Sequence, residues 1–348
     1  TSYRRSKLLF YFLGLSISLG TMLVILFSGF HIILRDFATQ YPFSTLLYGF
    51  LILLIFTLTG LPLTFYSSFI YDKKFKISQY KITGWFKDYL KSNLISYIIW
   101  LIIIAVLYFS IRNFSPWWIY AGMFSIVFSM AINYVYPLVV VPFMWKTSPY
   151  KDNSMKAKIL GLCRKLGVTN IRNIVVINES EKSVRPNAVF MGMGNSKRIG
   201  LFDTLLNSFT KDEIEAVVGH ELGHYVNKDI LRGLILESIV IFPALFIIDY
   251  LVGVLSPMLG IGGITDLESL PLIGLINSIL VFLLMPLINT HSRWRESEAD
   301  KFALMHVQKP KAQLSLEKRL SDLHLSELKP HPLIEFWLFT HPSTIKRI

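Results

Sequence analysis

The chain has 348 residues, of which 53% are hydrophobic and 17% are charged, and its mean hydropathy is +0.49. This composition, with several apolar runs long enough to cross a bilayer, excludes a purely water-soluble protein and indicates a multi-pass membrane protein. The net charge of +12 would suit nucleic acid, but the basic residues gather in segments between spans, so we expect no nucleic-acid partner.

Six apolar runs predict six transmembrane helices, because about 20 apolar residues are needed to cross the hydrocarbon core. The runs are residues 8–34, 44–71, 93–111, 116–143, 234–256 and 271–290. They divide the chain into a four-span region (1–143), a polar segment (144–232), a two-span hairpin (233–290) and a second polar segment (291–348). An even number of crossings separates the basic segments, so one topology places both polar segments in the cytosol.

The first polar segment contains both helix and strand patterns. Residues 156–166 have the periodicity of an amphipathic helix. Three short runs rich in β-branched and other apolar residues predict strands at 173–178, 187–192 and 198–202. The glycines and asparagine between the last two runs predict a hairpin turn. We therefore expect a small β-sheet in a mainly α-helical protein.

The same polar segment then carries the pattern HExxH on a predicted helix. Thr210 and Glu213 form a capping box at its start. His220 and His224 lie four residues apart, so both imidazoles share one face of the helix and can bind a single ion. Glu221 points about 100° away, where it can act as a base on a water beside the metal. The pattern supplies two of the three protein ligands that catalytic zinc needs.

The third ligand must be a histidine or a carboxylate, because Cys163 is the only cysteine and a thiolate site is excluded. The second polar segment offers Glu296, with Asp300 four residues later on the same helical face. Glu296 completes a two-His, one-carboxylate site, and Asp300 can hydrogen-bond the far nitrogen of a ligating histidine. Glu298 is the alternative ligand, although it projects to another face. The two-span hairpin returns the chain to the same side of the membrane, so both halves of the site can meet.

Several motifs together resemble those of the type I CAAX prenyl proteases, which are integral-membrane zinc metalloproteases. They are HELGHY at 220–225, KRIGLFDTLL at 197–206, the run LPLTFYSSFIYDKKFKIS that ends at Ser78, the acidic run around Glu296, and HPSTIKRI at 341–348. The resemblance covers most of the chain from about residue 40 onward. It implies a barrel of transmembrane helices that encloses a chamber, with a cytosolic zincin-like metalloprotease domain and one zinc ion per chain.

The resemblance also implies a role for each residue that matches a family motif. The matching residues are His220, His224 and Glu296 as zinc ligands, Asp300 as the hydrogen-bond partner of a ligand, Glu221, His341 and Arg347 as catalytic residues, and Asn187, Ala188 and Gly192 as substrate-binding residues. Glu221 would be the general base, while His341 and Arg347 would steady the oxyanion and organise the site. The substrate-binding residues would lie on an edge strand that pairs with an extended peptide.

Two features depart from the family pattern. The family typically has seven spans, so we expect that a first span is missing from this sequence. Arg185 and Pro186 stand where members more often have His and Ser. Because proline removes one backbone donor at the edge of the substrate-pairing strand, we expect a different substrate preference.

The sequence thus predicts a zinc endopeptidase that acts on prenylated CAAX-type peptides or membrane-associated proteins, with its active site on the cytosolic side. Its partners would be a peptide or protein substrate and the bilayer, in the endoplasmic reticulum of a eukaryote or the inner membrane of a bacterium. In a bacterium, the alternative is a quality-control protease with no prenyl requirement. A transporter that uses the intramembrane acids Glu237 and Asp249 is another interpretation, as is an inactive scaffold.

Overall fold

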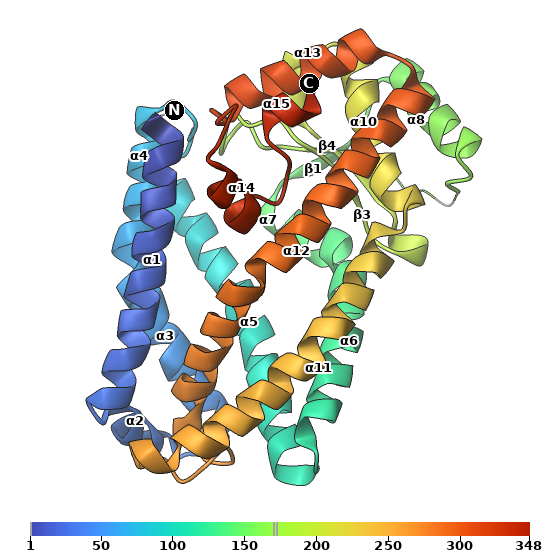
Figure 1. Cartoon of the computed structure of the whole chain (residues 1–348). Coiled ribbons are helices and arrows are strands. Elements are labelled where there is room, and N and C mark those ends of the chain that lie inside the picture. Colours follow the sequence, from blue (N-terminus) through green and yellow to red (C-terminus); the bar gives the residue numbers. More distant parts are fainter. Residues whose placement is uncertain (1, 170, 172) are drawn as a thin grey trace.

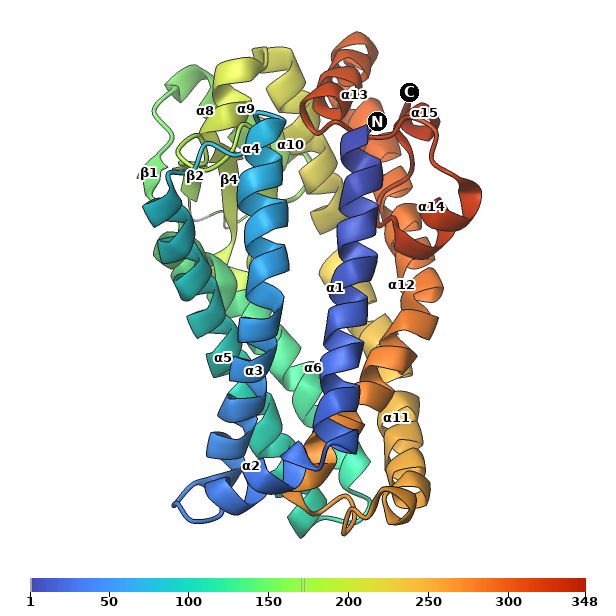
Figure 2. The ribbon, with the colours of Figure 1, turned by 90° about the vertical axis from the view of Figure 1, so that its left-hand side faces the viewer.

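The computed structural model of the chain describes residues 2–169, 171 and 173–348. Within this part, six helical segments are long and apolar enough to cross a membrane, which confirms the predicted number. They are α1 (Ser2–Phe27), the segment Ser44–Lys74, α5 (Ile82–Asn113), the segment Trp117–Met144, α11 (Asp229–Leu255) and the segment Leu267–Val307. Figures 1 and 2 show these helices around a common axis, with both chain termini at the end that carries the strands.

Two of the six segments contain a π-helical turn but remain continuous. They consist of α3 (Ser44–Phe65), η1 (Tyr66–Ile70) and α4 (Tyr71–Lys74), and of α6 (Trp117–Val135), η2 (Tyr136–Val140) and α7 (Val141–Met144). Both η1 and η2 are π-helical turns. Pro62 precedes the first turn and Pro137 lies in the second, and a proline cannot donate the usual intrahelical hydrogen bond.

The first and third predicted spans have different bounds in the structure. The apolar run 8–34 predicts one helix, but α1 ends before Gly29 and a separate helix, α2 (Phe30–Ala38), follows. Gly29 has a φ of +74°, a left-handed conformation that glycine adopts without the steric cost other residues meet. The third span begins at Ile82 and not at residue 93, because a helix continues beyond the apolar residues that mark a bilayer crossing.

The remaining helices connect the spans or lie near the strands. They are α8 (Asn153–Lys165), α9 (Asp203–Ser208), α10 (Lys211–Val226), α13 (Pro310–Leu323), α14 (Pro332–Leu338), α15 (Thr344–Arg347) and the 3₁₀ turns η3 (Gly194–Ser196) and η4 (Pro257–Leu259). The sixth span consists of the 3₁₀ turn η5 (Leu267–Ser269) and α12 (Leu270–Val307). With 38 residues, α12 includes both a membrane span and the segment that carries Glu296 and Asp300. The span and this part of the site therefore belong to one continuous helix.

A four-stranded sheet lies among the helices at one end of the molecule (Figure 1). Its strands are β1 (Thr147–Pro149), β2 (Asn173–Ile177), β3 (Ala188–Met191) and β4 (Arg198–Phe202), in the spatial order β1-β2-β4-β3. β4 pairs with β2 in parallel and with β3 in the antiparallel sense, so β3 is an edge strand. The three predicted strands are confirmed. β1 was not predicted, because three residues are too few to show an alternating pattern.

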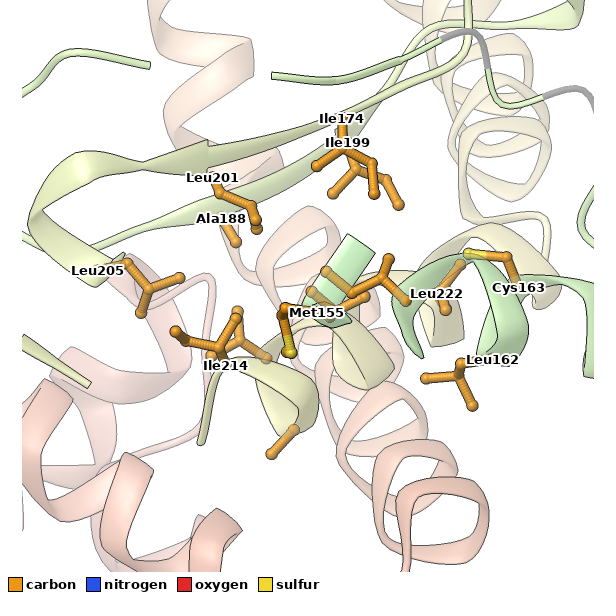
Figure 3. Close-up of a cluster of buried hydrophobic side chains, with 14 of the residues drawn as sticks. Met155, Leu162, Cys163, Ile174, Ala188, Ile199, Leu201, Leu205, Ile214 and Leu222 are labelled. Atoms are coloured by element: carbon orange, nitrogen blue, oxygen red, sulfur yellow. The ribbon is translucent and has the colours of Figure 1, made fainter. Parts of the chain in front are cut away.

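A hydrophobic core joins this sheet to α8 and α10 (Figure 3). Ile199 and Leu201 of β4 pack with Leu222 of α10 and with Met155 and Ile159 of α8, and all five side chains are fully buried. Burying one such side chain contributes about 1.5–3 kcal/mol to folding. The core therefore fixes the sheet, and with it the edge strand, relative to the helix that carries HExxH.

Candidate active site

The helix that carries HExxH is fixed at its first turn. Oγ1 of Thr210 accepts a hydrogen bond from the backbone N–H of Glu213 (3.3 Å), and the Glu213 carboxylate accepts one from the backbone N–H of Thr210 (2.8 Å). These two bonds form the expected capping box. The same carboxylate accepts hydrogen bonds from Ser315 (2.7 Å) and Arg319 (2.8 Å) on α13. The start of α10 is therefore held by α13.

Three candidate metal-ligating groups meet where α10 crosses α12. The Nε2 atoms of His220 and His224 are 3.1 Å apart. The Glu296 carboxylate lies 3.3 Å from Nε2 of His220 and 3.5 Å from Nε2 of His224. One donor atom from each residue lies within 4.8 Å of the others. The expected ligand set is thus brought together by two helices that are distant in the sequence.

Each histidine is oriented by a separate carboxylate. Nδ1 of His220 donates to Asp300 (2.8 Å), and Nδ1 of His224 donates to Asp229 (2.7 Å). Because a carboxylate only accepts hydrogen bonds, both Nδ1 atoms carry the proton and both Nε2 atoms present their lone pairs to a metal. Asp300 is in the expected place. Asp229, the first residue of α11, was missed by the sequence reasoning.

This arrangement fits a zinc ion. Two imidazole lone pairs face the same point, and Oε2 of Glu296 is buried there with no hydrogen-bond donor among the described residues. Burial lowers the pKa of His220, but contacts with Asp300 and Glu296 outweigh burial and raise that pKa to about 10. These carboxylates therefore favour positive charge at the ring, which a bound metal ion would supply in place of a second proton. Two histidine nitrogens and one carboxylate form a common ligand set of catalytic zinc, which leaves a coordination position open.

Two glycines permit the close approach of α10 to α12. A Cβ atom on Gly223 would lie 3.0 Å from Cα of Ala299 and 3.1 Å from Cβ of Phe302. A Cβ atom on Gly219 would overlap the side chain of Val307. Both glycines lie on the helix that bears the two histidines. The absence of side chains at these positions therefore sets the distance between the histidines and Glu296.

Glu221 connects α10, the helix that carries HExxH, to the edge strand β3. Its carboxylate accepts a hydrogen bond from the backbone N–H of Phe190 in β3 (3.1 Å). Burial raises the pKa of Glu221, while the neighbouring His220 and His224 lower it, and the net shift is upward. A carboxylate with a raised pKa beside candidate metal ligands is suited to general base catalysis.

The two C-terminal candidates take different positions around the ligands. Nε2 of His341 lies 3.3 Å from Oε1 of Glu296, and the His341 side chain is 59% exposed. Arg347 donates two hydrogen bonds to Asp300, of 2.8 and 2.7 Å, and pairs with Glu317 at 3.0 Å. Burial lowers the pKa of Arg347, but its bonds to Asp300 outweigh burial and raise it. Arg347 thus contacts the carboxylate that orients His220.

Glu298, the alternative third ligand, lies outside this group. Its carboxylate accepts a hydrogen bond from Arg232 of α11 at 2.5 Å. Glu298 lies two residues after Glu296 and so projects from a different face of the helix, which agrees with its contact with Arg232. The two intramembrane acids join α6 to α11: Glu237 accepts a hydrogen bond from Ser129 (2.8 Å), and Asp249 accepts one from Trp117 (2.7 Å).

The site opens into a cavity of about 830 Å³. Among the expected substrate-binding residues, Asn187 and Ala188 line this cavity, and Gly192 does not. Gly192 lies in the turn after β3 with a φ of +88°, and a Cβ atom there would meet the carbonyl oxygen of Ser196 at 2.6 Å. Its position therefore requires glycine for the shape of the hairpin. Asn187 directs its side-chain oxygen to the N–H of Ala188 at 2.9 Å.

The fold and this site define a membrane-spanning metallopeptidase. The family model described as Peptidase family M48 matches residues 149–348, and the model described as CAAX prenyl protease N-terminal, five membrane helices, matches residues 1–146. The chain belongs to peptidase family M48. It is therefore a metalloendopeptidase, and membership of this family implies a bound metal that is generally zinc.

Known proteins resemble the chain over most of its length. It is 30% identical to the uncharacterized metalloprotease YhfN of Bacillus subtilis, across 99% of this chain and 83% of that protein. It is 30% identical to CAAX prenyl protease 1 of Saccharomyces cerevisiae, across 84% of this chain and 68% of that protein. The crystal structure of S. mikatae Ste24p has the same fold, with a TM-score of 0.85 at 24% identity over 99% of this chain and 86% of that one. These matches confirm the resemblance to the CAAX prenyl proteases.

Proposed function

We propose that the chain is a zinc endopeptidase that cleaves peptide bonds in a cavity at the cytosolic face of a membrane. One observation carries this proposal: Glu221, His220, Glu296 and the start of the edge strand β3 line one cavity, and His224 lies 3.1 Å from His220 beside it. The distribution of Lys and Arg supports the cytosolic placement, since the sheet end of the molecule contains the basic segments. A water-accessible cavity also supplies the second reactant, which hydrocarbon would exclude.

The site residues have separate roles in this mechanism. His220, His224 and Glu296 would hold a zinc ion, which when bound supplies a Lewis acid for the scissile carbonyl and makes water more acidic. Glu221 takes a proton from the attacking water and returns it to the leaving amine, and its raised pKa suits a group that must accept and release a proton. His341 lies beside Glu296, where it can donate a hydrogen bond to the developing oxyanion.

The free edge of β3 supports binding of an extended peptide. β3 pairs with β4 on one side only, so its other edge presents backbone groups that can pair with a substrate strand. Asn187 and Ala188 at the start of this edge line the cavity. The hydrogen bond from Phe190 to Glu221 then places the base beside the paired peptide. Pro186, just before this edge, offers no backbone N–H to a substrate.

The intramembrane acids give little support to a transporter. Glu237 and Asp249 each accept a hydrogen bond from a side chain of α6, so both have a structural role between two spans.

Prenylated CAAX-type peptides are the substrate class that we propose, because several similar proteins are named CAAX prenyl proteases.

The substrate class is tested by comparing a farnesylated CAAX peptide with the same peptide lacking the lipid, using quenched-fluorescent labels and purified protein in detergent. Glu221→Gln provides the background rate. We expect the farnesylated peptide to be cleaved with the higher kcat/KM, because removing the apolar lipid from water adds binding free energy. Equal rates for both peptides, or cleavage of unfolded membrane proteins alone, would contradict a prenyl requirement and favour the quality-control interpretation.

A further inference from the structure

The catalytic cavity extends beyond the start of β3 to a group of basic residues. Arg4 and Lys7 of α1 line it together with Arg185, which lies two residues before Asn187. Arg185 stands at the position where members of the family more often have a histidine. The cavity therefore has a cationic region beyond one end of the strand edge that we propose binds substrate.

The three cations are not equally available to a ligand. Lys7 pairs with Asp72 at 2.7 Å. Arg4 lies over the ring of Phe339, 4.7 Å from its centroid, and is attracted by Glu327.

Arg185 differs from both of these residues. Its guanidinium donates a hydrogen bond to the hydroxyl of Tyr3 (2.6 Å), and its Nε atom is buried with no acceptor among the described residues. The hydroxyl of Tyr3 donates in turn to Asp72. Since Asp72 already pairs with Lys7, the charge of Arg185 is only indirectly compensated. Arg185 lines the cavity, so an anionic group of a ligand there can pair with the guanidinium and compensate its charge.

The backbone and one neighbour of Arg185 hold the guanidinium in place. Its N–H donates to Oγ of Ser183 (3.1 Å), and its carbonyl accepts a hydrogen bond from Thr204 (2.8 Å). Tyr3 is packed against Phe75, with 5.0 Å between the ring centroids. A preorganised arginine loses little conformational entropy when it binds a ligand.

We propose that Arg185 binds the free C-terminal carboxylate of the substrate. The inference rests on the proposed peptidase function, with the peptide paired along β3. One end of such a peptide lies toward Arg185 and the other toward the hairpin at Gly192. The cation repels a terminal ammonium group and attracts a terminal carboxylate, so the C-terminal end lies at Arg185. Substrate and β3 are then antiparallel.

The strand geometry also limits where the peptide is cut. Phe190 marks the reaction centre through its hydrogen bond to Glu221, and Arg185 lies five positions earlier in the chain. At about 3.3 Å per residue, these five positions span roughly 16 Å along the strand. The distance from the reaction centre to the guanidinium is shorter, because the arginine side chain can reach back toward the peptide. We therefore expect the cleaved bond to lie about three to five residues before the C-terminus.

The test compares one peptide in two forms, with a free C-terminal carboxylate and with a C-terminal amide. Cleavage by the wild-type chain and by Arg185→Gln gives kcat/KM for each form. Binding of both forms to Glu221→Gln and to the double variant with Arg185→Gln gives Kd without turnover. Arg164→Gln, on the exposed face of α8, is the matched control for loss of one arginine. Arg185→Lys keeps the charge, and thermal melting shows whether each variant is folded.

We expect the wild-type chain and Arg164→Gln to prefer the carboxylate form by about tenfold or more, and Arg185→Gln to lose that preference by losing activity on this form alone. Arg185→Lys should retain part of the preference. Equal loss on both forms, or no preference in the wild-type chain, would overturn the inference while leaving the peptidase function intact. A carboxylate preference in Kd without cleavage of either form would support the binding site and contradict the proposed function.

Discussion

At the residue scale, the proposed zinc ligands His220 and His224 are oriented by carboxylates that accept their Nδ1 protons. Asp229 accepts a hydrogen bond from Nδ1 of His224 at 2.7 Å and is itself buried. We expect Asp229→Asn to weaken zinc binding about 10- to 100-fold, because an amide neither fixes the tautomer nor raises the basicity of the ring as a carboxylate does. Competition with a chelator measures the zinc affinity directly.

Asp322→Asn is the matched control for that substitution, since Asp322 is an exposed aspartate near the end of α13. It should leave the zinc affinity unchanged. If Asp229→Asn bound zinc as tightly as the wild-type chain, the orienting role of Asp229 would be wrong.

The sequence predicted most of these side chains but not this one. His220 and His224, and likewise Glu296 and Asp300, could be paired because residues four apart share a helical face. Asp229 lies five residues after His224, beyond a break where Lys228 has a φ of +57°. That turn redirects the chain so that the first residue of α11 points back at the histidine. No periodic pattern signals such a contact.

At the element scale, the spacing between α10 and α12 is set by glycine. We expect Gly223→Ala to force the helices apart, because its new methyl group would lie 3.0 Å from the backbone of α12. Overpacking of this kind costs about 1–3 kcal/mol, and a shift of about 1 Å in the ligands can reduce activity by roughly 100-fold. Zinc content and kcat/KM would both fall.

Gly161→Ala on α8 is the control, since a Cβ atom at Gly161 has no described neighbour within 4 Å. It should be neutral or slightly stabilising, because alanine is the better helix former. Wild-type activity and zinc content in Gly223→Ala would show that the contact between the helices tolerates a methyl group.

The first turn of α10 predicts a pH-dependent stability. Burial alone would raise the pKa of Glu213, but hydrogen bonds from Thr210, Ser315 and Arg319 outweigh burial and hold the pKa below its ordinary value. A carboxyl group whose pKa is lowered by folding stabilises the protein above its unfolded pKa of about 4.3, and this contribution is lost as pH falls through the folded pKa.

We therefore expect Glu213→Gln to lower the melting temperature at pH 7, with a loss of about 1–3 kcal/mol in stability. The gap between variant and wild type should narrow as pH falls below the unfolded pKa of about 4.3, because the unfolded wild-type chain then takes up a proton that the folded carboxylate still excludes. Thermal melting in detergent at several pH values measures this gap. A gap that stays constant from pH 7 to pH 3.5 would show that the charge of Glu213 contributes nothing.

Helix and strand positions were easier to predict than their boundaries and pairings. The lengths of the apolar runs correctly predicted six spans, and the run of β-branched residues at 173–177 correctly predicted strand β2. Gly29 divides an apolar run whose composition does not change across the break. The parallel pairing of β2 with β4, which makes β3 an edge strand, depends on tertiary contacts that alternation along one strand does not reveal.

At the scale of the whole molecule, the charge distribution predicts which end faces the cytosol. Cysteine labelling from outside sealed cells tests this, with Met258→Cys in η4 and Lys329→Cys at the sheet end, both at exposed positions. A membrane-impermeant maleimide should label the first and not the second. Cys163 gives little background, because burial shields its thiol and raises the pKa to about 11. Labelling of Lys329→Cys in intact cells would show that the sheet end faces the outside and that the predicted topology is wrong.

The two halves of the site could be assigned to one side of the membrane because an even number of spans separates them in the sequence. Two crossings separate the HExxH helix from the segment with Glu296, so both lie at one end of the molecule, as the structure shows. The cavity and the cationic region near Arg185 could not be predicted, because they depend on how α1 approaches the strand edge.

The central claim is that a zinc site with Glu221 as its base cleaves peptide bonds. The most direct test measures zinc content and peptide cleavage for the wild-type chain and for Glu221→Gln, purified side by side in detergent. The account predicts one zinc ion per chain in both proteins, and a 10²- to 10⁴-fold lower kcat in the variant, the usual contribution of a general base. Full cleavage by a zinc-loaded Glu221→Gln protein would contradict it.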